Sequence, residues 1–327
     1  MKPQIAIVAG GDSSEFGVSL RSAQGIKSFI DADRYETTVV TITKKAWQAE
    51  LSETEKYPID KNDFSYVSSD GKKHNFDFAY ITIHGTPGEN GILQGYFDLL
   101  GLKYSCCDVL AASMTFNKFA CNRYLQAFGA KTAKSILIRK GNEFDAKNII
   151  SQLGLPCFVK SNVGGSSFGV TKVKAEETII PAIDMAFQEG DEVIVESFLK
   201  GTELTCGMYK TKSKTVVFPL TEVVTSNEFF DYDAKYNGQV QEITPARLSP
   251  ELTAEIQAQT AKYYDILGCK GIVRIDYIVS EDGVPYVLEA NTTPGMTATS
   301  FVPQQVRAAG LDIKDVMTDI IENEIGR

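Results

Sequence analysis

The first hundred residues alternate between short apolar runs and longer amphipathic segments. Residues 4–11 form an apolar run that ends in Gly-Gly, and residues 19–30 have apolar side chains at helical spacing. Residues 35–43 and 76–85 alternate in the manner of strands, and residues 91–101 have the pattern of a short helix that stops at glycine. This order predicts a small parallel sheet with covering helices.

The rest of the chain predicts mixed helices and strands. Ser113 is predicted to cap a helix over residues 114–128, and Ser249-Pro250 to begin another that ends at Gly268. Further helices are predicted near residues 145–153 and 177–190. The main strands are predicted at residues 134–140, 156–160, 170–174, 191–199, 201–209, 271–279 and 285–291.

An Asp-Gly pair joins the last two predicted strands, which indicates a hairpin with a two-residue turn. In that register Asp276 lies opposite Glu289, and Arg274 lies opposite Asn291, all on one face. Like charges directly opposite each other are destabilising. Two carboxylates and a carboxamide at one sheet end therefore favour a site for a hard cation such as Mg²⁺, with Arg274 beside it to bind an oxyanion. The alternative is a solvated hairpin end with scattered charges.

Two glycine-rich stretches are candidate ligand loops. "KSNVGGSSFGV" puts Lys160 at a strand end before Gly165 and Ser166, where backbone N–H groups could cradle phosphate oxygens. It is not a Walker A loop, and a flexible turn is the alternative. "AGGDSSEFGVSL" lacks GxGxxG but places Glu15 where a strand meets a helix. The alternative for Glu15 is a helix-start acid favoured by the dipole.

Composition excludes several classes of function. The net charge of −9 makes nucleic acid an unexpected partner, and no apolar run approaches the ~18 residues that a membrane helix needs. The first residues have the pattern of a strand and turn, and not of a signal peptide. The six cysteines lack CxxC spacing, which indicates reduced buried thiols. Two histidines are too few for a multi-histidine zinc site.

Seven motifs, taken together and in order, resemble the D-alanine–D-alanine ligases of the ATP-grasp superfamily. They are "GGDSSEFGVSL", "HGTPGENGILQG", "VKSNVGGSSFGV", "VESFLKGTE", "DYDAKY", "GCKGIVRIDY" and "LEANTTPGMT". The resemblance spans nearly the whole chain and implies a mixed α/β and α+β fold. An N-terminal Rossmann-like α/β domain over residues 1–106 would precede a two-part ATP-grasp fold, with a central subdomain over 107–200 and a C-terminal one over 201–327. ATP would be held between two antiparallel sheets.

The resemblance also implies roles for residues that match these motifs. Lys118, Lys160 and Lys235 would contact the phosphates of ATP, and Glu203 would bind its ribose. Four consecutive residues of one strand would line the adenine slot: Glu196, Ser197, Phe198 and Leu199. Two Mg²⁺ ions, with Mn²⁺ as an alternative, would be held by Asp276, Glu289 and Asn291.

The remaining implied roles concern the amino-acid substrates. Arg274 and the backbone N–H of Gly295 would form the oxyanion site. Glu15 would bind the ammonium group of the first D-alanine and would form a hydrogen-bonded set with Ser166 and Tyr236. His84 would lie by the first D-alanine. Ser300 and Phe301 would lie by the second D-alanine, with Ser300 near its carboxylate.

The family's reaction joins two D-alanine molecules through an acyl phosphate for peptidoglycan synthesis, typically in a cytoplasmic homodimer. Three residues depart from the family pattern, namely Asn90, Asn117 and Ser161, and none has a chemical role in the reaction. Three alternatives stay open. The first is a D-alanine–D-lactate ligase, against which Tyr236 argues. The others are an ATP-grasp ligase for another acid, and a non-catalytic nucleotide-binding module.

Overall fold

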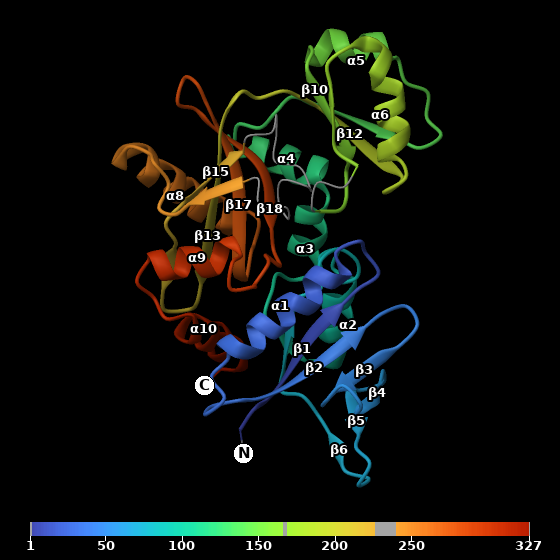
Figure 1. Cartoon of the computed structure of the whole chain (residues 1–327), viewed down its shortest axis with the longest axis vertical. Helices are drawn as coiled ribbons and strands as arrows, with labels where there is room; N and C mark the ends of the chain where they lie inside the picture. Colours follow the sequence, from blue (N-terminus) through green and yellow to red (C-terminus); the bar gives the residue numbers. More distant parts are fainter. Residues whose placement is uncertain (1, 166–168, 226–239, 327) are drawn as a thin grey trace.

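The computed structural model describes residues 2–165, 169–225 and 240–326. Its strands form three sheets that follow one another along the chain, and helices pack on each of them (Figure 1). The predicted mixture of α/β and α+β structure is therefore confirmed.

The first sheet has eight strands in the order β6-β5-β4-β3-β2-β1-β7-β8. Its bounds are β1 Gln4–Gly10, β2 Glu36–Ile42, β3 Trp47–Glu50, β4 Lys56–Asp60, β5 Ser65–Val67, β6 Lys73–His74, β7 Phe78–Ile81 and β8 Lys103–Tyr104. The strands β2, β1, β7 and β8 are parallel, as predicted, but β3 to β6 extend the sheet as antiparallel hairpins. The prediction of a small parallel sheet is wrong in this half, because short polar links allow neighbouring strands to pair directly.

Helices cover both faces of the first sheet. Helix α1 (Phe16–Phe29) and the C-terminal helix α10 (Ile313–Ile325) pack on the face that carries Ile5 and Ile7. Helix α2 (Ile92–Leu100) packs on the face that carries Ala6 and Val8. Alternate residues of β1 thus meet different helices, which is why this strand is one continuous apolar run.

The second sheet is antiparallel, in the order β11-β10-β12-β9. Its bounds are β9 Ser135–Arg139, β10 Cys157–Ser161, β11 Thr171–Val173 and β12 Glu192–Ser197. One apolar core joins this sheet to helices α5 (Ala146–Leu153) and α6 (Ile179–Ala186), the latter preceded by the 3₁₀ turn η1 (Glu176–Thr178). The other face is left for the cleft described below.

The third sheet is also antiparallel, in the order β16-β15-β13-β17-β18, with β14 paired to β13. Its bounds are β13 Gly201–Lys210, β14 Thr215–Val217, β15 Thr221–Thr225, β16 Val240–Ile243, β17 Gly271–Ser280 and β18 Pro285–Asn291. Helices α3 (Val109–Phe116), α4 (Lys118–Ala127) and α8 (Pro250–Ile266) share one core with it. Helix α9 (Phe301–Ala308) contacts β13.

Helix starts show one correct and one wrong prediction. Ser249 caps α8, as predicted, because its hydroxyl accepts a hydrogen bond from the Leu252 N–H at 3.2 Å. Ser113 is not a cap, because it lies inside α3 and its hydroxyl donates back to the Val109 carbonyl at 2.8 Å. The predicted single helix is two helices, and Asn117 separates them.

All six cysteines are buried and free, which agrees with the prediction of reduced thiols. Each predicted domain range contains one sheet, but α3 and α4 pack on the third sheet and α10 returns to the first. The domain boundaries at residues 106/107 and 200/201 therefore stay a prediction.

Candidate active site

Two adjoining cavities open where the three sheets meet. The larger has a volume of about 930 Å³ and is lined by the second and third sheets and by the loop after β1. The smaller, of about 540 Å³, is lined by α1, by the loop after β7 and by the segment between β18 and α9. Lys118, Gly165, Arg274 and Glu289 line both cavities, so the two form one continuous cleft.

The turn of the β17–β18 hairpin differs from the predicted one. The closing pair is Ser280 and Val284, since the Ser280 N–H donates to the Val284 carbonyl at 3.0 Å. The turn therefore contains three residues, Glu281–Gly283, with Gly283 at a φ of 78°. A three-residue turn that ends in a left-handed glycine is the next most common hairpin connection after the two-residue turn, so the Asp-Gly pair alone did not decide between them.

A bulge then restores the predicted register at the cleft. Val287 pairs with Tyr277 and Glu289 pairs with Asp276, so Leu288 is the extra residue. From there Arg274 pairs with Asn291, as predicted. The prediction at the site is correct because the longer turn and the bulge shift the register in opposite directions.

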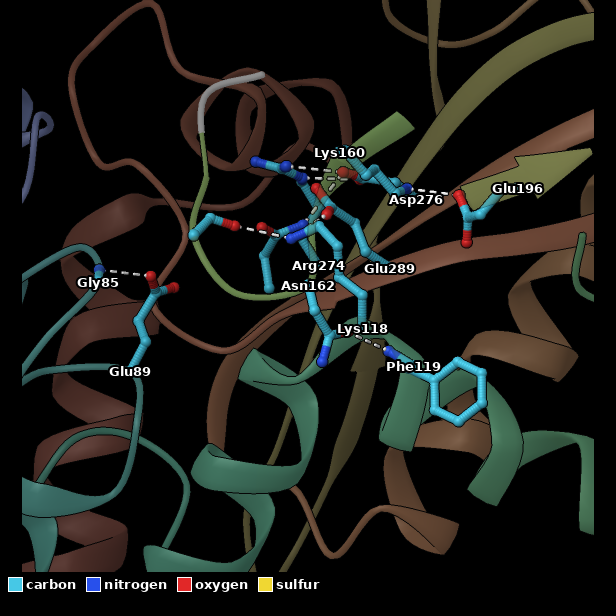
Figure 2. A network of polar contacts seen from close by, with 12 residues as sticks. Gly85, Glu89, Lys118, Phe119, Lys160, Asn162, Glu196, Arg274, Asp276 and Glu289 are labelled. Atoms are coloured by element: carbon cyan, nitrogen blue, oxygen red, sulfur yellow. Dashed lines mark hydrogen bonds and ion pairs between the residues drawn. The ribbon is translucent and has the colours of Figure 1, made fainter. Parts of the chain in front are cut away.

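Arg274 and Asp276 form a partly buried bidentate pair at the hairpin end (Figure 2). The Arg274 Nε donates to Asp276 Oδ1 and its Nη2 donates to Oδ2, both at 2.8 Å. Asn291 Nδ2 donates to the same Oδ2 at 3.0 Å. Burial disfavours the guanidinium charge, but Asp276 and Glu289 more than offset it, so the pKa of Arg274 lies above its ordinary value.

The ammonium group of Lys118, in the first turn of α4, is the second positive charge beside the hairpin. Its Nζ lies 3.2 Å from Glu289 Oε2 and donates to the Gly164 carbonyl at 2.7 Å. Asn162, at the end of β10, positions this helix start, because its Oδ1 accepts from the Phe119 N–H at 2.8 Å. Figure 2 shows this contact beside Lys118, next to the Arg274 group.

Lys160, on β10, is the third cation of the cleft. It pairs with Glu196 of β12 at 2.6 Å, and their side chains are 15% and 7% exposed. Burial disfavours the ammonium charge, but Glu196 and Glu289 outweigh it and raise the pKa of Lys160. The structure therefore brings together all three predicted cations that it describes, each facing a carboxylate.

Past Glu196 the larger cavity becomes an apolar slot. Its wall includes every predicted adenine-slot residue, together with the predicted ribose ligand: Glu196, Ser197, Phe198, Leu199 and Glu203. The Phe198 ring lies 6.0 Å from the Phe158 ring, and the Lys172 ammonium group lies 4.3 Å above it. A slot bordered by aromatic and aliphatic side chains suits a planar heterocycle.

At the other end, Glu15 and Gly165 meet across the cleft. Glu15 precedes α1 and is buried, but it makes no side-chain cap to that helix. The Glu15 Oε2 lies 2.6 Å from the position that a Cβ on Gly165 would occupy. Glu15 thus stands at the start of α1 without a capping hydrogen bond, and the dipole alternative stays open. Gly165 is glycine because the carboxylate occupies the space of a Cβ.

His84 and Glu89 line the smaller cavity with little charge compensation. Burial lowers the pKa of His84, and the positive charge of Arg274 lowers it further, whereas the negative charge of Glu15 raises it. Burial is the largest of these effects, so the imidazole is neutral near pH 7. Among the described residues, its Nε2 has no hydrogen-bond partner. Burial and then Glu15 raise the pKa of Glu89 to about 7, although its Oε2 accepts from the Gly85 N–H at 2.7 Å.

The segment before α9 closes the smaller cavity. Ser300 stands at the helix start, and its hydroxyl exchanges a hydrogen bond with Thr297 Oγ1 at 2.8 Å. Gly295 lies beside it, since a Cβ there would be 3.1 Å from the Ser300 hydroxyl. The Arg274 guanidinium stacks over the Phe301 ring at 5.2 Å. The predicted oxyanion and acceptor residues therefore converge.

Two of the three departures from the family pattern, Asn117 and Asn90, make hydrogen bonds within the structure. Asn117 caps α4, accepting from the Ala120 N–H at 2.9 Å, as an aspartate would. Asn90 donates to Thr86 Oγ1 at 3.0 Å within its loop. Ser161 is buried at the end of β10, and nothing in the described residues explains its hydroxyl.

Three predicted residues, Ser166, Lys235 and Tyr236, lie outside the described residues. Several residues of the smaller cavity were not predicted, among them Glu89 and Arg21. Glu89 follows His84 in the same glycine-rich loop, and this proximity in the sequence could have identified it. Arg21 lies three residues after Val18, which itself lies three residues after Glu15, so each is a neighbour of the next on the surface of α1.

Asp276, Glu289 and Asn291 fit a hard divalent cation by their chemistry, because each can supply an oxygen ligand from one sheet end. Among the residues described, no group of three or more histidine, cysteine or acidic side chains forms a metal cluster. A cation here would therefore have two carboxylates and one carboxamide, and its other ligands would be water or substrate oxygens. None of the helices in the described ranges has the length and apolar character to cross a membrane.

Comparison with protein families gives two matches in chain order. The family model described as "D-ala D-ala ligase N-terminus" matches residues 4–107, and that described as "D-ala D-ala ligase C-terminus" matches residues 124–322. The D-alanine–D-alanine ligase of Phocaeicola vulgatus is 65% identical over 325 residues, which cover 99% of this chain and 100% of that protein.

Solved structures agree with this match. The VanG D-Ala:D-Ser ligase of Enterococcus faecalis superposes with a TM-score of 0.88 at 28% identity, over 98% of this chain and 99% of that one. The Bacillus anthracis D-alanine–D-alanine ligase complexed with ATP has a TM-score of 0.77 at 29% identity, over 98% and 97% of the two chains.

Proposed function

The chain belongs to the D-alanine–D-alanine ligase family, and we propose that it joins two D-alanine molecules to D-alanyl-D-alanine, converting ATP to ADP and phosphate. The dipeptide is a precursor for cell-wall peptidoglycan. The observation that carries this function is the full-length match to a ligase at 65% identity, with both family models in order. The fold is accordingly an ATP-grasp fold.

ATP is proposed to occupy the larger cavity, which we call the nucleotide end. The apolar slot from Glu196 to Leu199 takes the adenine, and Glu203 binds the ribose. Lys118 and Lys160 contact the phosphates, and Lys235 is assigned to the terminal phosphate by family resemblance. The support is that a slot bordered by rings leads to paired ammonium groups at the hairpin. Phosphate would replace Glu196 and Glu289 as the partner of each lysine.

Magnesium is proposed to bind at Asp276, Glu289 and Asn291, as two ions by family resemblance, with manganese as an alternative. Bound by these three side chains, a divalent cation would supply positive charge that stabilises the phosphates of ATP. Arg274 and the Gly295 N–H are proposed to stabilise the oxyanion that develops on the substrate. Arg274 would then exchange part of its pairing with Asp276 for a substrate oxygen, which a rigid, always charged guanidinium can do.

The amino acids are proposed to occupy the smaller cavity, the amino-acid end. Glu15 holds the ammonium group of the first D-alanine, with Ser166 and Tyr236 assigned to the same hydrogen-bonded set by resemblance. His84 lines this cavity, and its Nε2 has no hydrogen-bond partner among the described residues, which supports a place for it beside the first D-alanine. Ser300 and Phe301 border the second D-alanine.

The reaction has two balanced steps. A carboxylate oxygen of the first D-alanine attacks the γ-phosphorus, the bond to the bridging oxygen of ADP breaks, and an acyl phosphate forms. The amine of the second D-alanine, after losing a proton, attacks the acyl carbon, and inorganic phosphate leaves with its bonding pair. Both steps place negative charge on oxygens, so fixed cations and N–H donors contribute most of the acceleration. No side-chain nucleophile is required.

The test is phosphate release from ATP and Mg²⁺, with the products identified by mass. D-Alanine alone should release phosphate and give the dipeptide, while L-alanine should not. D-Lactate and D-serine are each added in competition with D-alanine, and the products show which acceptor the enzyme prefers. D-Serine is included because a structurally similar protein is a D-Ala:D-Ser ligase. A depsipeptide or mixed dipeptide as the main product would move the assignment to that acceptor. No release would contradict the ligase.

Two further properties are proposed on the family resemblance alone: a homodimer and a cytoplasmic location. Sedimentation of the purified protein tests the first, since a monomer at all micromolar concentrations would contradict it. Fractionation of the source cells tests the second.

A further inference from the structure

Helix α1 brings an anion and a cation to the wall of the smaller cavity. Glu15, Val18 and Arg21 all line that cavity. They follow one another three residues apart, in an oblique row that we call the stripe, in which each residue is a neighbour of the next on the helix surface. The stripe begins with a carboxylate at the helix start and ends with a guanidinium about a turn and a half later.

Arg21 differs from the other arginine and lysine side chains of this cavity. Lys118 contacts Glu289 and Arg274 pairs with Asp276. Arg21 has no hydrogen bond or ion pair with any residue that the structure describes, and its side chain is exposed. Its Nη1 lies 3.5 Å from where a Cβ on Gly17 would stand, so the guanidinium leans back along the helix toward Glu15. A charge at the cavity wall is thus available to a ligand.

The charges of this stripe match the ends of the product. D-Alanyl-D-alanine carries an ammonium group at one end and a carboxylate at the other, separated by about 7 Å in an extended dipeptide. Glu15 and Arg21 are six residues apart, a rise of about 9 Å along the helix, which the backward lean of Arg21 shortens. An extended dipeptide with its ammonium group on Glu15 is therefore long enough for its carboxylate to reach Arg21.

We propose that Arg21 binds the carboxylate of the second D-alanine and so selects an α-amino acid as the acceptor. This rests on the proposed ligase function, with Glu15 holding the first substrate. A guanidinium can hold a carboxylate through two parallel hydrogen bonds. Ser300, which borders the same part of the cavity, supplies only a hydroxyl that Thr297 already engages. Arg21 supplies the charge that Ser300 lacks.

The test is a competition between D-alanine and D-alaninamide. The amide has no carboxylate, so it cannot be phosphorylated as the first substrate, and it enters the product only as the acceptor. Mass spectrometry of the mixture gives the ratio of D-alanyl-D-alanine to its amide. The wild-type protein should strongly favour D-alanine. In Arg21→Gln this preference should fall by roughly ten- to a hundredfold, because a charged hydrogen-bonded pair is lost.

Steady-state kinetics should separate binding from chemistry. In Arg21→Gln the KM for the second D-alanine should rise by a similar factor, while the KM for ATP and the saturated kcat stay within about twofold. Arg21→Lys keeps the charge and should recover part of the preference. Lys27→Gln removes an exposed charge from the same helix outside the cavity, and it should behave as wild type.

An unchanged product ratio in Arg21→Gln would overturn the proposal, as would an equal change in Lys27→Gln. A loss of kcat with an unchanged KM would also overturn it, because that result indicates a structural role. Failure of the ligase function itself is distinguishable, because the wild-type protein would then make neither product.

Discussion

The two ends of the cleft hold their charges in different ways. At the nucleotide end, Lys160, Lys118 and Arg274 each face a carboxylate, at 2.6, 3.2 and 2.8 Å. At the amino-acid end, His84 is neutral, Glu89 has a raised pKa, and Arg21 has no ion pair within the described residues.

This difference indicates which interactions each end makes before its ligand binds. Ion pairs hold the nucleotide end in place before ATP arrives, so phosphates and metal must exchange with carboxylates that are already there. At the amino-acid end, burial favours the neutral forms of His84 and Glu89, and the Nε2 of His84 has no hydrogen-bond partner among the described residues. Substitutions at the two ends should therefore have different effects. At the nucleotide end they should leave a charge without its partner, and at the amino-acid end they should change the fit or protonation of the site.

The largest expected effect is at Glu289, which faces Lys118 and is a proposed metal ligand. Glu289→Ala should lower kcat by about a thousandfold or more while the fold persists, because charge stabilisation of this kind contributes two to three orders of magnitude. Dipeptide formation measures activity, and thermal unfolding checks the fold. Glu281→Ala is the matched control, since it removes an exposed carboxylate from the same hairpin. Near-normal turnover in Glu289→Ala would contradict the metal assignment.

Lys160 and Glu196 test whether the ion pairs hold the nucleotide end together. Lys160→Met leaves the Glu196 carboxylate buried without its partner, so the free energy of unfolding should fall by about 3–5 kcal/mol. The double variant Lys160→Met/Glu196→Leu removes both charges and should recover most of that loss. Denaturant unfolding of the three proteins measures this. If the double variant is no more stable than the single one, a stranded charge is not the cause.

Gly165 tests fit at the amino-acid end. A methyl group there would lie 2.6 Å from Glu15 Oε2, so Gly165→Ala should displace the carboxylate that holds the first D-alanine. Overpacking of this kind costs about 1–3 kcal/mol, so kcat/KM for the first D-alanine should fall roughly tenfold or more. Gly95→Ala is the control, because its added methyl group would meet only ordinary contacts in α2. Equal kinetics for the two variants would show that the close approach has no catalytic consequence.

The smallest expected effect is a pH dependence at Glu89. Burial, followed by Glu15, raises the pKa of Glu89 from an ordinary 4.5 to about 7. Between these values the folded protein binds more protons at this site than the unfolded chain does. The contribution of Glu89 to stability is therefore present below about pH 4.5 and is lost as the pH rises to about 7.

Glu89→Gln removes this titration, so its free energy of unfolding should decline less than that of wild type between about pH 4.5 and 7. Glu177→Gln, an exposed carboxylate on η1, should keep the wild-type slope. Denaturant unfolding across this pH range makes the comparison. Parallel slopes for Glu89→Gln and wild type would mean that Glu89 titrates normally.

The sequence predicted most of the nucleotide end because its residues lie at fixed places in regular strands. Alternate residues of a strand point to the same face, so Arg274 and Asp276 lie on one face whichever turn the hairpin has. The longer turn and the bulge shift the strand register in opposite directions, and Glu289 therefore still lies opposite Asp276. The helix break at Asn117 was missed, because apolar periodicity continues through it and only the side-chain cap reveals it.

The amino-acid end was harder to predict, because it is assembled from separate segments. Arg21 and Glu89 are charged residues of ordinary appearance in their own helix and loop. They can be identified as site residues only from the tertiary structure, in which α1, the loop after β7 and the segment before α9 surround one cavity. In the antiparallel half of the first sheet, the sequence indicated only a surface loop or hairpin over residues 60–75, because the strands there are short and mostly polar.

The central claim is that the cleft activates a carboxylate of D-alanine by phosphorylation before the amine attacks. The most direct measurement uses D-alanine with both carboxylate oxygens replaced by ¹⁸O, followed by mass analysis of the released phosphate. The account predicts one ¹⁸O atom in each phosphate, because that oxygen bridges carbon and phosphorus in the acyl phosphate. Unlabelled phosphate, released at the same rate as dipeptide, would contradict the mechanism.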